Sequence, residues 1–400
     1  MKKKKNTWIK PRHKFLKKFL FFFFKPYVKH KYCIDVEKFK EQCDRQYLIL
    51  MNHQTAYDQF FVAEAFDGPV YYIATEDIFS MGLVSKLINW LQAPIPIKKQ
   101  TTDLKAVKTC LRVAKEGGTI CLAPEGNRTY CGRTVNMKPS IAKLAKTLRI
   151  PIAIFRIEGG YGIQPRWSDE VRKGRMKAYV SKVIEPEEFK NMSDEELFEI
   201  IEKELYVNES SADGEYTGKA LAEYLDRVVY VCPDCGLAEF VSHGDIIECK
   251  KCHKQIRYLP TKELKCITSD FPFRFVGDWY DYQSDFVNKL DVTQLTEQPV
   301  FTDKADISEV IVYQNKVPYR KNSTIRLYGD KVIIDDDMII NFDDADLITV
   351  LGKNKLNIYW QDKIYQLKGD EHFNALKYVN FYHRYKNIKE GNSDGKFLGL

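Results

Sequence analysis

Short apolar runs alternate with helical patterns through the first half of this chain. The run at 47–51 has the length and aliphatic content of a buried strand, and a helical pattern begins at Thr55. Further strands are expected at 68–79, 93–97, 119–122 and 150–154, and helices at 81–92, 103–115 and 137–148. Strands that alternate with helices predict an α/β domain whose functional loops gather at one edge of the sheet.

The helix expected at 103–115 carries a more specific prediction. It should stop at Gly117, as helices do where a left-handed residue is needed. Four apolar residues share one side of this helix at helical spacing. They are Leu104, Val107, Leu111 and Ala114.

The second half of the chain changes character twice. Charged residues dominate from about residue 168, and 193–227 is predicted to be mostly helical. Aromatic residues within 265–300 favour a helix packed on a neighbour. Beyond residue 300, apolar runs flank Gly329-Asp330 and Gln361-Asp362 and predict hairpins, and 371–387 predicts a last helix. This order resembles a small pleckstrin-homology (PH)-type β-barrel closed by a C-terminal helix, with its ligand left open.

Positive charge is concentrated at the N-terminus. The formal net charge is +7, yet twelve of the 62 Lys and Arg residues precede the first acid, Asp35, which leaves 50 bases against 55 acids. The apolar block Phe19–Phe24 is bordered by Lys17, Lys18 and Lys25 and is far shorter than the ~20 residues of a membrane span. Aromatic bulk rimmed by lysine favours a segment in the interface of an anionic membrane. The alternative is a buried first helix with a solvated basic tail.

No other run approaches spanning length, and there is no small-residue cleavage site of a secretory signal. We therefore expect a peripheral or monotopic protein on the cytoplasmic face of the membrane.

His53 and Asp58 lie on the predicted turn between the first strand and the following helix. Such a turn can fold the carboxylate back onto the imidazole. A carboxylate on one ring nitrogen fixes the tautomer and leaves the other nitrogen free to accept a proton, as a base that activates a hydroxyl requires. The alternative is that Asp58 only caps the helix and His53 is only a turn residue.

Three blocks resemble, in order and spacing, those of the glycerolipid acyltransferases that make phosphatidic acid from lysophosphatidic acid. His53 and Asp58 match the H-x4-D element of that family. APEGNRT, residues 123–129, is similar to its F-P-E-G-T-R-S element, and IPIAIF, residues 150–155, to its fourth, proline-containing element. The resemblance implies an α/β fold, a glycerolipid-acyltransferase-like sheet flanked by helices.

The chain departs from the family pattern in two blocks. Where the second block usually carries arginine, this chain has Lys99, or alternatively Lys98. Ala123 replaces the usual aromatic residue and Asn127 the usual threonine. These changes leave the identity of the acceptor open.

The resemblance also implies roles for individual residues. His53, oriented by Asp58, would take the proton from an acceptor hydroxyl as it attacks the thioester of acyl-CoA or acyl-ACP. Arg128, as a planar fork, and Lys99, as a compact charge, would hold the phosphate of a lysophospholipid. Gly126 would permit close backbone approach. Glu125 would orient Arg128 or an acceptor hydroxyl, although an ion pair between Glu125 and Arg128 is the alternative.

Four cysteines have the spacing C-x2-C-x13-C-x2-C, and they are Cys232, Cys235, Cys249 and Cys252. This spacing predicts a zinc ribbon in which four thiolates hold one structural Zn²⁺, with no open position for catalysis. The alternative is a pair of disulfides, which a reducing cytosol disfavours. His243 and His253 are interpreted as ribbon surface, and the other six cysteines as reduced thiols. Basic residues of the ribbon lack the aromatic interleaving of a single-strand nucleic-acid site, so nucleic acid is not expected as a partner.

The sequence therefore predicts five parts. They are a basic aromatic membrane-anchoring segment at 1–31, an acyltransferase domain at 32–227, a zinc ribbon at 228–262, a helical connector at 263–300 and a PH-like β domain at 301–390. The predicted function is transfer of a fatty acyl group to a lysophospholipid hydroxyl, most simply lysophosphatidic acid to phosphatidic acid. The alternative is a catalytically silent lipid-binding or scaffold protein that uses the ribbon and the PH-like domain to bind partners.

Overall fold

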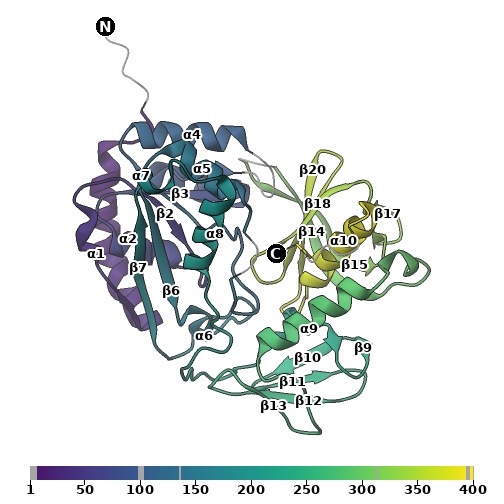
Figure 1. Cartoon of the computed structure of the whole chain (residues 1–400). Helices are drawn as coiled ribbons and strands as arrows, with labels where there is room; N and C mark the ends of the chain where they lie inside the picture. The colour runs from purple at the N-terminus through teal and green to yellow at the C-terminus, as the bar shows by residue number, and fades with distance from the viewer. Residues whose placement is uncertain (1–6, 98–102, 135–136, 312–313, 393–396, 400) are drawn as a thin grey trace.

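The computed structural model describes residues 7–97, 103–134, 137–311, 314–392 and 397–399 of the 400-residue chain. An N-terminal α/β domain forms one side of the molecule, and a curled C-terminal sheet lies beside it (Figure 1). The ribbon lies below both in that view, and the helix α9 (Val276–Lys289) runs between the ribbon and the C-terminal sheet. The α/β fold followed by a ribbon and a curled antiparallel sheet is the predicted fold class.

The N-terminal sheet has seven strands in the order β1-β7-β6-β2-β5-β3-β4. Its strands are β1 (Ile34–Val36), β2 (Leu48–Met51), β3 (Val70–Thr75), β4 (Ile95–Ile97), β5 (Thr119–Leu122), β6 (Ile152–Glu158) and β7 (Met176–Ile184). All neighbours are parallel except β6 and β7. The carboxyl ends of β2, β5 and β6 therefore meet at one edge of the sheet, where the loops that follow them lie together.

Helices cover both faces of this sheet, which is why β2 is buried at all four positions. On one face, Leu48 and Leu50 pack with α4, α5 and α8, and on the other Ile49 and Met51 pack with α1 and α2. The helices are α1 (Pro11–Tyr32), α2 (Asp58–Ala65), α3 (Leu83–Gln92), α4 (Leu104–Lys115), α5 (Ser140–Leu148), α6 (Gly160–Ile163), α7 (Pro186–Phe189) and α8 (Asp194–Leu205). Short 3-10 helices are η1 (Lys40–Gln42), η2 (Glu76–Ser80), η3 (Leu225–Arg227) and η4 (Val292–Gln294).

Helix α4 begins and ends as predicted. The Asp103 carboxylate caps it by accepting from the backbone N–H groups of Lys105 and Ala106, and Gly117 follows it with a positive φ of 84°. The buried positions are Ala106, Cys110, Val113 and Ala114, whereas Leu104 is exposed. The side turned to the sheet overlaps the apolar side of the sequence at Ala114 and at the partly buried Leu111, but it is rotated away from Leu104.

Other local differences have identifiable causes. Helix α2 begins at Asp58 and not at Thr55, because the Asp58 side chain folds back onto the preceding turn. Only α8 and the single turn η3 form within the stretch predicted as mostly helical at 193–227. The intervening residues 206–224, which include the turn-forming Ser210-Ser211-Ala212-Asp213-Gly214, are irregular.

The ribbon contains a small antiparallel sheet and a two-stranded knuckle. The sheet strands are β10 (Phe240–His243), β11 (Ile246–Cys249), β12 (Gln255–Tyr258) and β13 (Leu264–Cys266), and the knuckle strands are β8 (Val231–Cys232) and β9 (Gly236–Leu237). The fourth strand continues beyond the predicted boundary at 262. Trp279 of α9 is fully buried and packs edge-on against Phe240, so the connector closes over the ribbon.

The C-terminal sheet has seven antiparallel strands in the order β17-β16-β15-β14-β20-β19-β18. The strands are β14 (Phe301–Val310), β15 (Lys316–Leu327), β16 (Lys331–Ile334), β17 (Met338–Asn341), β18 (Ala345–Leu351), β19 (Lys355–Trp360) and β20 (Lys363–Gly369). Both predicted hairpins are present. The last helix, α10 (Leu376–Lys389), packs in the curl of the sheet (Figure 1). Its Leu376, Val379 and Tyr382 are buried, and so is Phe373 just before it.

Candidate active site and metal centre

His53 and Asp58 meet on the turn between β2 and α2. The Nδ1 atom of His53 lies 2.7 Å from Oδ2 of Asp58. The Asp58 carboxylate is fully buried and also accepts hydrogen bonds from the backbone of Gln54 (2.7 Å) and from the backbone and hydroxyl of Thr55 (2.9 and 2.6 Å). Because these donors fix the carboxylate, they also fix the imidazole that it holds.

The other ring nitrogen of His53, Nε2, makes no hydrogen bond to the described part of the chain, and the side chain is 25% exposed. When Asp58 accepts a hydrogen bond from Nδ1–H, Nε2 carries the lone pair and can accept a proton from a molecule outside. This is the geometry of a general base.

The segment after β5 supports the same turn. Oε1 of Glu125 accepts a hydrogen bond from the backbone N–H of His53 at 2.8 Å, and Glu125 is buried. Gly126 has a φ of +68°, which favours glycine, and the space where a Cβ would lie is open. Glu125 therefore holds the histidine turn, and Gly126 leaves room beside it.

Arg128 connects the two turns. Its Nε donates to the carbonyl of Gln54 at 3.2 Å, and its Nη2 to the carbonyl of Gln164 at 2.8 Å. Burial lowers the pKa of Arg128 to about 10, against the opposing effect of the Asp58 carboxylate, and the charge of Arg166 lowers it further. Within the described residues only Nη1 is left unbonded, so this arrangement offers an anion one nitrogen, whereas the predicted fork would offer two.

A second buried cation adjoins Arg128. Arg166 is 4% exposed, its Nη1 donates to the carbonyl of Arg128 at 2.8 Å, and its guanidinium lies 4.2 Å from the centre of the Tyr130 ring. Lys98 and Lys99, the other predicted cations, lie outside the described residues. Nothing in the local sequence around Gln164-Pro165-Arg166 signals a site, and this residue was not predicted.

Residues 32–157, which contain the turns described above, match the family model described as Acyltransferase. This segment is an acyltransferase-family domain. It spans the turn that carries His53 and Asp58 and the loop that carries Glu125, Gly126 and Arg128, so the family resemblance predicted from the sequence is confirmed.

One solved structure similar to part of the chain is that of the 1-acyl-sn-glycerophosphate (LPA) acyltransferase PlsC from Thermotoga maritima. It is 21% identical and covers 47% of this chain and 77% of that chain, with a TM-score of 0.39. No curated protein matches the chain in the sequence comparison.

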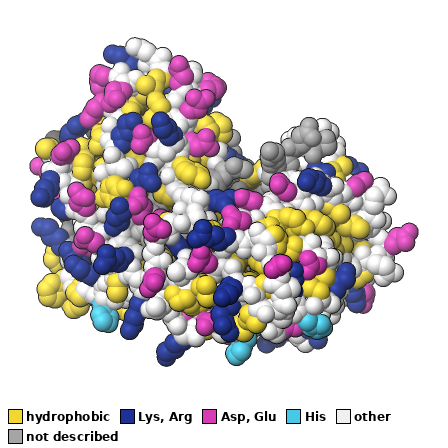
Figure 2. Space-filling model, turned by 60° about the horizontal axis from the view of Figure 1, so that its bottom comes forward, with side chains coloured by type: hydrophobic (Ala, Val, Ile, Leu, Met, Phe, Trp, Pro, Cys, Tyr) yellow, Lys and Arg dark blue, Asp and Glu magenta, His cyan; other side chains and the backbone are white. Residues whose placement is uncertain are grey.

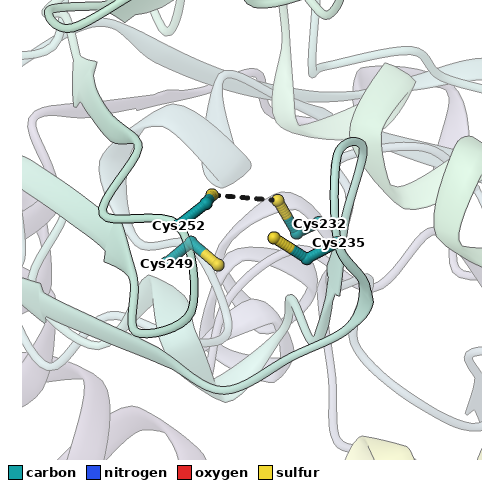
Figure 3. Close-up of side chains that lie close together, drawn as sticks. All are labelled: Cys232, Cys235, Cys249 and Cys252. Atoms are coloured by element: carbon teal, nitrogen blue, oxygen red, sulfur yellow. Dashed lines mark hydrogen bonds between the residues drawn. The ribbon is translucent and has the colours of Figure 1, made fainter.

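Beyond the acyltransferase domain, four cysteines gather in the ribbon (Figure 3). The sulfur atoms of Cys232, Cys235, Cys249 and Cys252 all lie within 4.8 Å of one another, and those of Cys232 and Cys252 are 3.7 Å apart. Four thiolates around one Zn²⁺ at ~2.3 Å are ~3.8 Å apart, so the cluster has the size of a tetrahedral metal site. A salt bridge of 2.6 Å between Lys254 and Asp234 ties the two knuckles together.

The remaining predicted ribbon residues lie outside this cluster. The side chains of His243 and His253 are 96% and 75% exposed and contact Glu223 and Glu248. All ten cysteines are free thiols. On the face that brings the ribbon side forward, basic and acidic side chains are interspersed (Figure 2).

Helix α1 has a buried side and an exposed side. His13, Val28 and Tyr32 are buried against the acyltransferase domain, and Lys17 turns inward to donate to the carbonyls of Phe66 and Gly68. The opposite side exposes Phe15, Phe19, Phe22, Phe23 and Tyr27. One side of α1 is therefore buried in the domain, and the opposite side carries exposed aromatic residues. A search of the described residues finds no helix long and apolar enough to cross a membrane.

Proposed function

We propose that this protein transfers a fatty acyl group from an acyl thioester, acyl-CoA or acyl-ACP, to the hydroxyl of a lysophospholipid, with lysophosphatidic acid as the simplest acceptor. The observation that carries the proposal is the contact of His53 with the buried Asp58 inside an acyltransferase-family domain. A scaffold protein would not need a fully buried carboxylate that holds a partly exposed imidazole in one tautomer.

In the proposed reaction, Nε2 of His53 takes the proton of the acceptor hydroxyl as its oxygen attacks the thioester carbon. The new C–O bond forms, the C–S bond breaks, and the proton passes from His53 to the departing thiolate. General-base assistance of this kind contributes ~10²–10⁴-fold to the rate. Nη1 of Arg128 and the open space over Gly126 support binding of an anionic headgroup beside the histidine.

Incubation of the purified protein with labelled acyl thioesters and vesicles that contain a panel of lysophospholipids tests the proposal. We expect His53→Gln to lower turnover by ~10²–10⁴-fold. The control is His243→Gln, which changes an exposed ribbon histidine and should leave turnover unchanged. Equal transfer by wild type and His53→Gln would remove the dyad from the mechanism, and no transfer to any acceptor would favour the scaffold alternative.

We also propose that the ribbon cysteines hold Zn²⁺, because four thiolates match its preferred ligands and number. With four protein ligands, the ion would have a structural role. Helix α1 is proposed to lie on an anionic membrane surface through its exposed aromatic side, which would place the protein on the cytoplasmic face of the membrane.

A further inference from the structure

Helix α3 exposes an apolar side although it belongs to a folded domain. Only Ser85 of this helix is buried. Leu83 is 81% exposed and Leu87 54%, and Val84 and Trp90 lie on the same side of the helix, as their spacing of three to four residues requires. Ile78 and Met81, just before the helix, are exposed as well. A run of large exposed apolar side chains on one helix marks an interaction surface.

This apolar side is continuous with that of α1. Nε of Arg12 donates to the carbonyl of Trp90 at 3.2 Å, and the Arg12 guanidinium lies 5.6 Å from the centre of the Trp90 ring. The indole N–H of Trp8 donates to the carbonyl of Ala93 at 3.0 Å. The N-terminal end of α1 and the residues just before it are therefore hydrogen-bonded to the C-terminal end of α3.

The charge of the two helices indicates what covers them. Helix α1 contains seven Lys or Arg residues and α3 contains Lys86, and neither contains Asp or Glu. Of these bases, Lys14, Lys18 and Lys29 are exposed along one border of the aromatic side of α1, and Lys25 on the same border pairs with Glu64 of α2 at 2.8 Å. Apolar side chains bordered by cations, without acids, complement an anionic bilayer surface.

We propose that α3 is a second membrane-contacting helix, and that α1 and α3 together dock the protein on an anionic bilayer. Helix α3 follows the carboxyl end of β3, which neighbours β5 in the sheet, so the surface borders the sheet edge that carries His53. Lipid substrates would then reach the histidine from the bilayer itself. The docking does not depend on acyl transfer.

Binding to vesicles of phosphatidylcholine with and without phosphatidylglycerol tests the surface. Removal of 1–31 would also remove the buried Val28 and is a poor test, so point variants are preferable. Each buried leucine contributes ~1.5–3 kcal/mol, so Leu83→Glu with Leu87→Glu should weaken binding by at least ~tenfold. The control is Ile339→Glu, which changes an equally large exposed apolar residue on β17 and should bind as wild type does.

Tryptophan fluorescence gives a second measurement, which reports how deeply α3 enters the bilayer. Lipids with brominated acyl chains should quench tryptophan fluorescence of wild type more than that of Trp90→Phe. Unchanged vesicle binding of the double variant, or equal quenching of the two proteins, would overturn the proposal. So would sedimentation that shows a dimer broken by the double variant, because the surface would then bind a second copy of this chain.

A different set of contacts joins the C-terminal sheet to the candidate active site. The turn between β18 and β19 reaches the acyltransferase domain, where Nε of Arg166 donates to the carbonyl of Gly352 at 3.0 Å. Nζ of Lys353 donates to the carbonyl of Ser168 at 2.6 Å and to the Asp169 carboxylate at 2.7 Å. The turn is thus held at two points.

A series of hydrogen-bonded residues connects this turn to His53. Arg166 donates to both Gly352 and Arg128, and Arg128 donates to the carbonyl of Gln54. The backbone N–H of Gln54 donates to Asp58, which holds His53. We infer that Arg166 is a positioning residue through which the C-terminal domain sets the place of Arg128, and that this controls affinity for the phosphate of the acceptor. The effect on affinity rests on the proposed function.

Kinetics with a phosphate-bearing and a phosphate-free acceptor test this inference. Arg166→Lys retains the charge but not both hydrogen bonds, so the KM for lysophosphatidic acid should rise by ~tenfold, equivalent to one hydrogen bond of ~1.4 kcal/mol. The KM for the thioester and for monoacylglycerol, and kcat, should stay the same. Lys353→Ala should act in the same direction, and the control Lys363→Ala, which loses a surface ion pair with Glu309, should not.

Hydrogen exchange without substrate separates this inference from the proposed function. Lys353→Ala should speed exchange of amides in 52–58, and Lys363→Ala should leave it unchanged. Unaltered exchange in Lys353→Ala, or a uniform change in every KM and in kcat, would overturn the positioning role. If Lys353→Ala speeds exchange at 52–58 but the protein transfers no acyl group, the positioning of the histidine turn by the C-terminal domain is supported. Only the proposed effect on acceptor affinity would then be rejected.

Discussion

At the scale of single residues, the carboxylate of Asp58 combines two tasks. It orients His53, and it gathers the backbone N–H groups of Gln54 and Thr55 at the end of β2. A buried carboxylate is stable only when several donors surround it. The same donors that satisfy the buried oxygens of Asp58 therefore hold the turn in the shape that catalysis would need.

Thr55 allows this arrangement to be tested. Its buried hydroxyl donates to Asp58 at 2.6 Å, and Thr55→Val removes that donor while it keeps the shape of the side chain. A hydrogen bond to a charged group contributes ~1.5–3 kcal/mol, so the free energy of unfolding should fall by that amount in urea titrations. Thr55→Ser should restore it. A valine variant as stable as wild type would contradict the role of the hydroxyl.

His383 on α10 gives a prediction about pH. Burial lowers its pKa from 6.5 to about 4, and the cation of Lys138 acts in the same direction. Since the unfolded chain binds this proton more readily, the stabilisation is complete above pH 6.5 and is lost as pH falls from 6.5 to 4, by at most ~3 kcal/mol. Urea titrations at several pH values should show this slope, which His383→Gln should reduce and His243→Gln should not.

At the scale of elements, the sequence predicted most helices and strands of the acyltransferase domain because their apolar periods are strong. It did not predict β7, whose pattern is interrupted by Lys177 and Lys182, since one side of this strand faces solvent. The sequence did not single out Ala106 and Cys110 as inward positions of α4, because they are weakly apolar by sequence yet are buried against the sheet. Periodicity measures hydrophobicity, and close packing also depends on size.

The ribbon allows a direct test of the proposed metal site. Its strands are short, so the proposed zinc ion should supply much of its stability. Cys249→Ser should abolish binding of one equivalent of metal and lower the melting temperature. Cys266→Ser, which removes a thiol outside the cluster, should retain the metal. Metal analysis of the purified proteins tests both expectations. A Cys249→Ser protein that keeps a full equivalent of metal would contradict the proposed site.

At the scale of the whole molecule, one arginine joins the acyltransferase domain to the C-terminal domain. Arg227 is 2% exposed, and it donates to the carbonyls of Trp167 and Glu371 and to the Asp169 carboxylate. Arg227→Met leaves the carbonyl of the buried Trp167 without this donor, whereas Asp169 keeps its ion pair with Lys353, so unfolding should cost ~1–3 kcal/mol less. Arg45→Met, which breaks only a surface pair with Glu185, should change stability by less than ~1 kcal/mol. Calorimetry would measure both, and equal losses would contradict a special role for Arg227.

Contacts of this kind are the part of the structure that the sequence could not predict. The H-x4-D spacing and the cysteine spacing are local, so His53, Asp58 and the four-sulfur cluster could be proposed from neighbouring residues. Arg166 meets Gly352 across 186 positions of sequence, and no local pattern encodes such a pairing. The order of the parts could be predicted, but the way in which the last part touches the first could not.

The pairing of β1 with β7 has a consequence for how the molecule is made. Ile34 pairs with Met176, so the first strand to leave the ribosome has no partner until nearly the whole domain has been synthesised. Closing so long a loop is slow and entropically costly. Until then the phenylalanines of α1 belong to a segment without its folded partners, and they can contact other apolar surfaces near the ribosome.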